Sequence, residues 1–169
     1  LGSSGLPAEG EMEFGERIAY GIPDVLGRHR DVYAGRTTLV VGAGHSAANA
    51  LLDLDRLAKG EQETAAIWAT RGTNLARIFS GGDADQLPAR GELGAETRSL
   101  VESGRTPLVA GFAILALRQE DGRIMVDGET AEGPRTIGPV DVIISAGCRR
   151  LELSLTRCFR LSFLSWLVC

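Results

Sequence analysis

The chain has 169 residues, of which 44% are hydrophobic and 24% are charged, a composition that fits one globular domain. Its net charge of −4, with acidic and basic residues mixed, argues against a nucleic-acid-binding surface. The three cysteines form no C-x-x-C pair, and no apolar run reaches the ~20 residues that a membrane helix needs. We therefore expect a cytoplasmic protein with no nucleic-acid or membrane partner. His29 and His45 have no neighbouring cysteine or carboxylate at the spacing of metal ligands, so we expect no metal site.

The first part of the chain, residues 1–35, is rich in glycine, proline and charge, which predicts a linker with one short helix over residues 11–19. The opening LGSSGLPAEGE is typical of a loop and does not begin with methionine. This start is like the interior of a longer protein, and an expression-tag remnant is the alternative for GSSG.

Strand and helix patterns alternate after the linker. TTLVVG is a β-branched apolar run, and HSAANALLDLDRLA has apolar residues at helical spacing. Further runs predict a strand, a helix ended by glycine and another strand. In chain order these elements occupy residues 37–42, 45–58, 64–70, 94–104 and 106–111. Such alternation predicts a parallel sheet.

The pattern then changes to three strand-like stretches, FAILALRQ, DGRIMVDGE and PRTIGP, of which the first two are joined by the hairpin signal Asp121-Gly122. VDVIISAG, residues 140–147, returns to a buried apolar run. The predicted class is α/β: a Rossmann-like parallel sheet with helices on both faces, and a three-stranded antiparallel meander inserted before the last parallel strand.

The motif Gly42-x-Gly44-x-x-Ala47 joins the first of these strands to its helix, as a dinucleotide-binding turn does. Gly42 permits the tight turn, Gly44 lets the backbone approach a pyrophosphate, and a small residue follows where helix and strand pack. The helix start supplies free N–H groups and partial positive charge. The predicted cofactor-binding residues here are Gly42, Ala43, Gly44, His45, Ser46 and Ala47.

The same letters nearly spell the G-x-S-x-G elbow of α/β-hydrolases, with Ser46 as the nucleophile. That alternative needs a histidine later in the chain, and none follows Ser46. Ala48 also stands where the elbow has glycine. The hydrolase interpretation therefore depends on a histidine from outside this chain.

Arg71 follows the second strand, at the place where an acidic residue binds the ribose 2′-hydroxyl of NAD. Its guanidinium suits the 2′-phosphate of NADP, and Arg77 could add a second contact. We therefore predict NADP(H) in preference to NAD(H), with a surface arginine as the alternative interpretation of each residue.

The stretch from GIPD through GAGHSA, followed by Arg71, the meander and VDVIISAG, resembles the nicotinamide-binding domain of two-dinucleotide-domain flavoproteins. That family includes thioredoxin-reductase-like and flavin-monooxygenase-like FAD-dependent oxidoreductases. The resemblance implies a nucleotide-binding domain over residues 36–147 and a return segment toward an FAD domain over residues 148–169. It also adds Ala146 and Gly147 to the cofactor-binding residues, and it implies that the chain is a fragment.

The sequence departs from that family in ways that limit the expectation. No second G-x-G turn is present to hold FAD, and no redox cysteine pair is present, so FAD is expected only in the complete protein. The implied function is to bind NADPH and position the nicotinamide for hydride transfer to FAD, with no catalytic residue expected in this chain. A non-catalytic nucleotide-binding or interaction module is the alternative.

Overall fold

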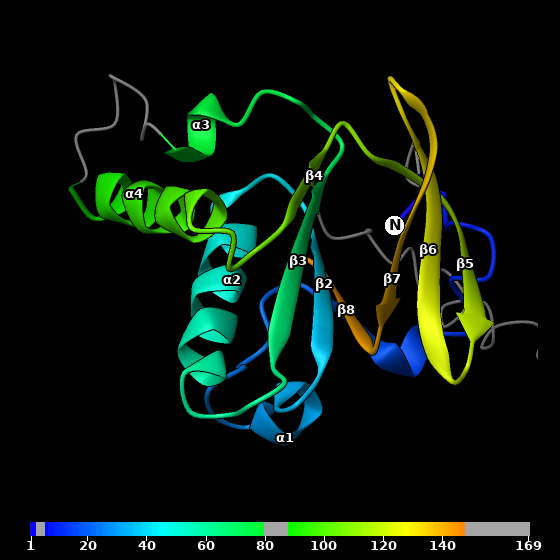
Figure 1. Ribbon diagram of the computed structural model, residues 1–169, viewed down its shortest axis with the longest axis horizontal. Helices are drawn as coiled ribbons and strands as arrows, with labels where there is room; N and C mark the ends of the chain where they lie inside the picture. Colours follow the sequence, from blue (N-terminus) through cyan, green and yellow to red (C-terminus); the bar gives the residue numbers. More distant parts are fainter. Residues whose placement is uncertain (3–5, 80–87, 148–169) are drawn as a thin grey trace, which may run out of the picture.

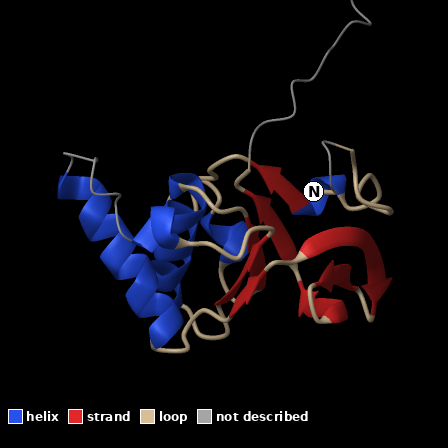
Figure 2. Cartoon of the chain, turned by 90° about the horizontal axis from the view of Figure 1, so that it is seen from above, coloured by secondary structure: helices blue, strands red, loops and turns tan. Residues whose placement is uncertain are grey.

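The computed structural model describes residues 1–2, 6–79 and 88–147. Three layers are stacked: helices, a parallel sheet, and an antiparallel sheet (Figure 1). Seen from above, the α-helices lie on one side of the parallel strands, and the second sheet and a short 3₁₀ turn lie on the other (Figure 2). The α/β class and the inserted antiparallel meander are therefore confirmed.

The parallel sheet has five strands in the spatial order β1-β8-β2-β3-β4. The strands are β1 (Ile18–Tyr20), β2 (Thr37–Val41), β3 (Ala65–Thr70), β4 (Leu108–Ala110) and β8 (Val142–Ser145). From β2 the chain continues outward to β3 and β4, whereas β8 and β1 lie on the other side of β2. The strand order therefore reverses between β2 and β8, which is the topological switch point where ligands bind in such sheets.

Helix α2 covers one face of this sheet because its apolar residues recur at helical spacing. They pack with the residues of β2, β3 and β8 that point to the same face, among them Val40, Trp68 and Ile144. The helices of the described residues are η2 (Gly15–Arg17), α1 (Arg30–Tyr33), α2 (His45–Ala58), α3 (Ala76–Phe79) and α4 (Pro88–Glu102).

The second face is covered by the antiparallel sheet of β5 (Ala113–Glu120), β6 (Arg123–Thr130) and β7 (Gly133–Val140). Its inward residues pack with Leu39 and Ile143 of the parallel sheet. The prediction of helices on both faces is therefore wrong in one respect, because the meander itself forms the second covering layer. It can do so because β6 buries the alternate residues Ile124 and Val126, and β5 buries Ile114 and Leu117 on either side of a bulge.

The segment before β2 also differs from expectation. The helix predicted over residues 11–19 does not form; residues 15–17 make a single 3₁₀ turn, and β1 follows directly. β1 pairs in parallel with β8 through Ile18↔Ile143 and Tyr20↔Ser145. Part of the predicted linker thus belongs to the parallel sheet. The predicted return segment, residues 148–169, lies outside the described residues.

Candidate functional site

The two glycine motifs of the sequence meet at the carboxyl edge of the parallel sheet. Gly42 follows β2 with a φ of 139°, a conformation that favours glycine. A Cβ on Gly42 would lie 3.2 Å from the carbonyl carbon of Ala146 and 3.3 Å from the nitrogen of Gly147. The N–H of Ala146 donates to the carbonyl of Val41 at 2.9 Å, which continues the β2–β8 pairing to this point. Gly42 is glycine because the chain after β8 passes close beside it.

No steric contact among the described residues requires glycine at position 44. Gly44 is the N-cap of α2 in extended conformation, with φ −125° and ψ 173°, which other residues adopt as well. Among the described residues, a Cβ there would meet no atom within 4 Å, and the same is true of Gly147. The described part of the chain therefore leaves open space above both glycines.

The remaining residues of the turn differ in how far they are exposed. Ala47 is fully buried and lets α2 pack closely on the sheet. Ala43 and His45 are exposed, and Ser46 is half-buried. No acidic residue occupies the first turn of α2, and the first N–H groups of a helix have no acceptor within it. The turn therefore presents donors and partial positive charge toward the open space.

Trp68 is a residue of this site that the sequence analysis missed. Its side chain, from β3, is fully buried, and its indole Nε1–H donates to the carbonyl of Gly42 at 2.7 Å. A buried tryptophan usually finds a partner for its N–H, so the tryptophan in the second predicted strand indicated that an acceptor lies near it, but not which one.

Arg71 lies directly after β3, at the same carboxyl edge, and its side chain is exposed. The hydroxyl of Thr70 donates to the carbonyl of Gly72 at 2.8 Å, which shapes the turn that carries Arg71. No acidic residue ends β3. Arg77 lies in the short helix α3, and its role stays a prediction.

The hydrolase alternative gains no support from the described residues. Ser46 lies in the first turn of α2 at the carboxyl edge. His29 is the N-cap of α1, which lies at the amino end of β2 (Figure 1), whereas Ser46 follows the carboxyl end of that strand. No serine–histidine pair forms there.

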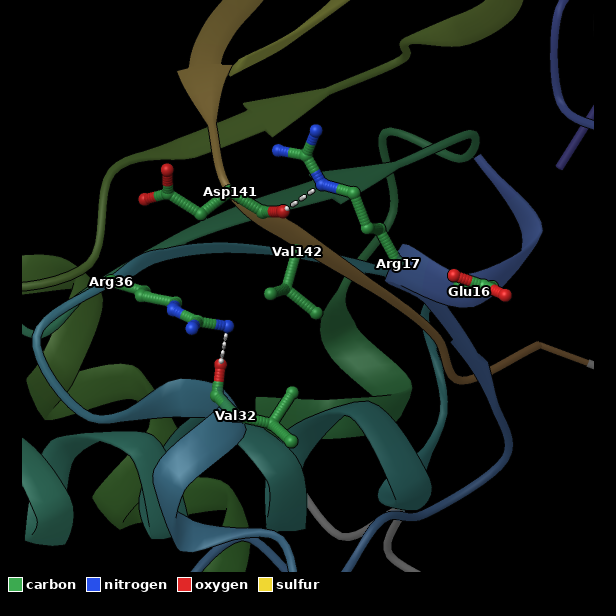
Figure 3. A pocket seen from close by; sticks show the side chains of 6 residues that line it. All are labelled: Glu16, Arg17, Val32, Arg36, Asp141 and Val142. Carbon is green, nitrogen blue, oxygen red and sulfur yellow. Dashed lines mark hydrogen bonds between the residues drawn. The ribbon is translucent and has the colours of Figure 1, made fainter. Parts of the chain in front are cut away.

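A pocket of about 300 Å³ opens at the amino edge of the sheet, opposite to the glycine turn (Figure 3). It is lined by Glu16, Arg17, Val32, Arg36, Asp141 and Val142. The five-residue strand β2 puts roughly 16 Å between this edge and the carboxyl edge.

Polar groups around this pocket are mostly bonded to one another. Arg17 donates from Nε to the carbonyl of Asp141 at 2.9 Å, as Figure 3 shows, and Arg123 holds the Asp141 carboxylate at 2.9 and 3.0 Å. The other carboxylate contact is the N–H of Thr37 at 2.8 Å. The pocket therefore marks a structural junction between β2, β8 and the antiparallel sheet.

Among residues 1–2, 6–79 and 88–147, no group of three or more histidine, cysteine or acidic side chains could hold a metal ion. In the same part of the chain, no helix is both long and apolar enough to cross a membrane.

No family model matches the sequence, and no curated protein matches it. Solved structures do resemble the fold. The bacillithiol disulfide reductase Bdr of Bacillus cereus aligns over 83% of this chain with a TM-score of 0.56 and 16% identity. The FAD-bound cadaverine monooxygenase DfoA of Erwinia amylovora aligns over 83% with a TM-score of 0.59 and 14% identity.

A thioredoxin reductase from Gloeobacter violaceus aligns over 82% of the chain with a TM-score of 0.52 and 14% identity. The chain spans only 35%, 41% and 36% of the lengths of these three proteins, in the order given. At such identities the likeness is one of fold. The chain therefore has the fold of one part of these disulfide reductases, thioredoxin reductases and flavin monooxygenases, and the resemblance noted in the sequence is confirmed at that level.

Proposed function

We propose that this chain binds NADPH across the carboxyl edge of its parallel sheet and, within a two-domain flavoprotein, holds the nicotinamide for hydride transfer to FAD. The observation that carries the proposal is the meeting of Gly42 with Ala146 and Gly147 at the switch point, beside the N-terminus of α2. The pyrophosphate would lie at that N-terminus, over Gly44.

The residues at this edge fit a dinucleotide. A Cβ on Gly44 or Gly147 would meet no atom of residues 1–2, 6–79 or 88–147 within 4 Å, so a phosphate can approach the backbone there. α2 has 14 residues and no acid in its first turn, so its dipole is not cancelled where the phosphates would bind. Ser46 is half-buried beside the turn, and its hydroxyl could donate to a phosphate oxygen.

The proposed preference for NADPH rests on Arg71. This side chain is exposed at the end of β3, the strand whose tip meets the adenine ribose in this fold. A guanidinium there can make charged hydrogen bonds with a 2′-phosphate. NADH lacks that phosphate, so it would gain nothing from Arg71.

FAD enters the proposal only through the complete protein. In this proposal the turn after β2 binds the nicotinamide nucleotide, so FAD would bind elsewhere in the complete protein. DfoA, which has a similar fold in this part, binds FAD. When both cofactors are bound, the nicotinamide supplies a hydride and the flavin accepts it. The residues of this chain bind and orient the nucleotide, and none of them needs to move a proton.

The test is a calorimetric titration of the purified chain with NADPH and NADH at fixed salt, repeated with Arg71→Ala. We expect NADPH to bind more tightly than NADH, and Arg71→Ala to weaken NADPH roughly ten- to a hundredfold with little change for NADH. Arg135→Ala is the matched control, since Arg135 is an exposed arginine on β7, in the antiparallel sheet.

Three outcomes contradict the proposal in different ways. Failure of a folded chain to bind either nucleotide would reject the site itself. Equal losses in Arg71→Ala and Arg135→Ala would reject the phosphate contact and leave only a general charge effect. A purified chain that carries flavin absorbance and oxidises NADPH unaided would reject the division of labour between two domains.

A further inference from the structure

We propose that Trp68 is a positioning residue of the dinucleotide turn, which aims the N–H of Ala43 at the pyrophosphate. The proposal deepens the function proposed above and rests on it. The Trp68 side chain is fully buried, so it would not contact the nucleotide itself. It acts through the single peptide that joins Gly42 to Ala43.

The indole is held in a fixed orientation. Trp68 lies on β3 in register with Val40 of β2, and its ring and that of Phe79 are arranged edge to face, with a centroid distance of 6.0 Å and an interplanar angle of 86°. The guanidinium of Arg98 in turn lies over the Phe79 ring at 5.4 Å. The register of β3 against β2 brings the indole N–H to the carbonyl of Gly42, and Phe79 packs against the ring.

Residues of β3 form hydrogen bonds with both the N–H and the carbonyl of Gly42. The N–H of Gly42 donates to the carbonyl of Ala69 at 3.1 Å, and its carbonyl accepts from Trp68 at 2.7 Å. The first bond continues the ordinary pairing of β2 with β3. The second bond is outside that pairing and exists only because residue 68 is a tryptophan.

Peptide planarity transmits this second bond to the ligand side. In a trans peptide the C=O and the N–H point in opposite directions. The carbonyl of Gly42 points inward to Trp68, so the N–H of Ala43 points outward, and Ala43 is exposed. Glycine at position 42 would otherwise let this peptide rotate, because it has no Cβ to restrict it. The hydrogen bond from Trp68 thus restricts the rotation of the peptide between Gly42 and Ala43.

The discriminating variant is Trp68→Phe, which keeps an aromatic ring and removes the N–H. We expect it to weaken NADPH binding on the order of tenfold, as the loss of one charged hydrogen bond does. The matched control is Phe79→Leu, which disturbs the packing of the same ring cluster and keeps the indole bond. It should bind NADPH as the wild type does.

A second ligand localises the effect. Adenosine 2′-monophosphate carries the phosphate expected at Arg71 but has no pyrophosphate. Its affinity should be the same in wild type and Trp68→Phe. Equal losses for both ligands in Trp68→Phe would mean that the whole edge is distorted, and would overturn a specific role for Trp68.

Backbone NMR gives a readout that packing alone would not change. Titration with NADP⁺ should shift the Ala43 amide resonance in the wild type and in Phe79→Leu, and should leave it nearly unshifted in Trp68→Phe. If phenylalanine prevents folding, replacing the indole by benzothiophene in a Trp166→Phe background keeps the shape and removes only the N–H.

The outcomes separate the two proposals. A wild-type chain that binds no nucleotide overturns both. A wild type that binds NADPH, with unchanged binding after loss of the indole N–H, overturns the role of Trp68 and leaves the nucleotide site standing.

Discussion

The two edges of the parallel sheet differ in what surrounds their polar groups. At the amino edge, Asp141 collects the N–H of Thr37 and the guanidinium of Arg123, and its carbonyl accepts from Arg17. At the carboxyl edge, Gly44 and Gly147 face open space. The polar cluster around the pocket at the amino edge holds the two sheets together, whereas the exposed backbone at the switch point is where we propose that the nucleotide binds.

The amino edge should respond to mutation through stability. Asp141→Ala removes the acceptor for Thr37 and Arg123, and we expect the free energy of unfolding to fall by about 2–3 kcal/mol. Urea denaturation measures this loss. NADPH affinity should not change while the variant is folded, because Asp141 lies at the opposite edge of the sheet from the turn.

Glu61→Ala is the control for a carboxylate at that edge. Glu61 pairs with Arg30 at 2.7 Å on the exposed surface, so its loss should cost less than about 1 kcal/mol. If Asp141→Ala is no less stable than Glu61→Ala, the hydrogen bonds at the amino edge do not hold the two sheets together.

The carboxyl edge should respond through binding. Gly44→Ala meets no neighbouring atom in an extended backbone, so its stability should stay within about 1 kcal/mol of wild type. Its methyl group would enter the proposed phosphate space, and NADPH should bind roughly tenfold more weakly. Titration and thermal melting of the same sample test both expectations.

Gly42→Ala sharpens that result. It is strained by a φ of 139° and by close backbone contacts, so it should lose about 1–3 kcal/mol of stability together with binding. For the preceding variant, Gly44→Ala, an unchanged NADPH affinity would show that no phosphate approaches Gly44.

The smallest expected effect lies far from both edges, on the antiparallel sheet. The Thr136 hydroxyl, 2.6 Å from the Asp127 carboxylate, lowers the pKa of Asp127; Arg118 at 2.8 Å lowers it further, against the opposing effect of burial. A lowered folded-state pKa gives stability above the unfolded value of about 3.9 and loses it as the pH falls through the folded value.

The wild type should therefore lose more thermal stability than Asp127→Asn when the pH is lowered from about 6 to about 3. NADPH binding at neutral pH should be the same in both proteins. Parallel melting curves for the two proteins over this range would contradict the assignment to Asp127.

Local signals predicted much of this fold. The strand TTLVV, the glycine turn and the helix over residues 45–58 form as expected, because each depends on neighbours within one turn or one strand. The hairpin at Asp121-Gly122 also forms, with φ of 49° and 79° at its two positions, as its turn chemistry requires.

Non-local features were missed for a physical reason. β1 has only three residues, and its partner β8 comes more than 120 residues later, so no nearby pattern marks it as a strand. The bond from Trp68 to Gly42 depends likewise on the register of β2 against β3. The covering of the second face by the meander follows from tertiary packing, which periodicity alone does not encode.

The position of β8 between β1 and β2 has a consequence for synthesis on the ribosome. Among the described strands of this sheet β8 is the last to be made, although it lies between β1 and β2, so those two strands cannot be joined until residues 142–145 have left the exit tunnel. Until then one edge of β2 has no partner, and Leu39 and Val40 lack part of their packing. We expect nascent chains that end before β8 to aggregate or to need a chaperone, and the final strand to close the sheet in a late, cooperative step.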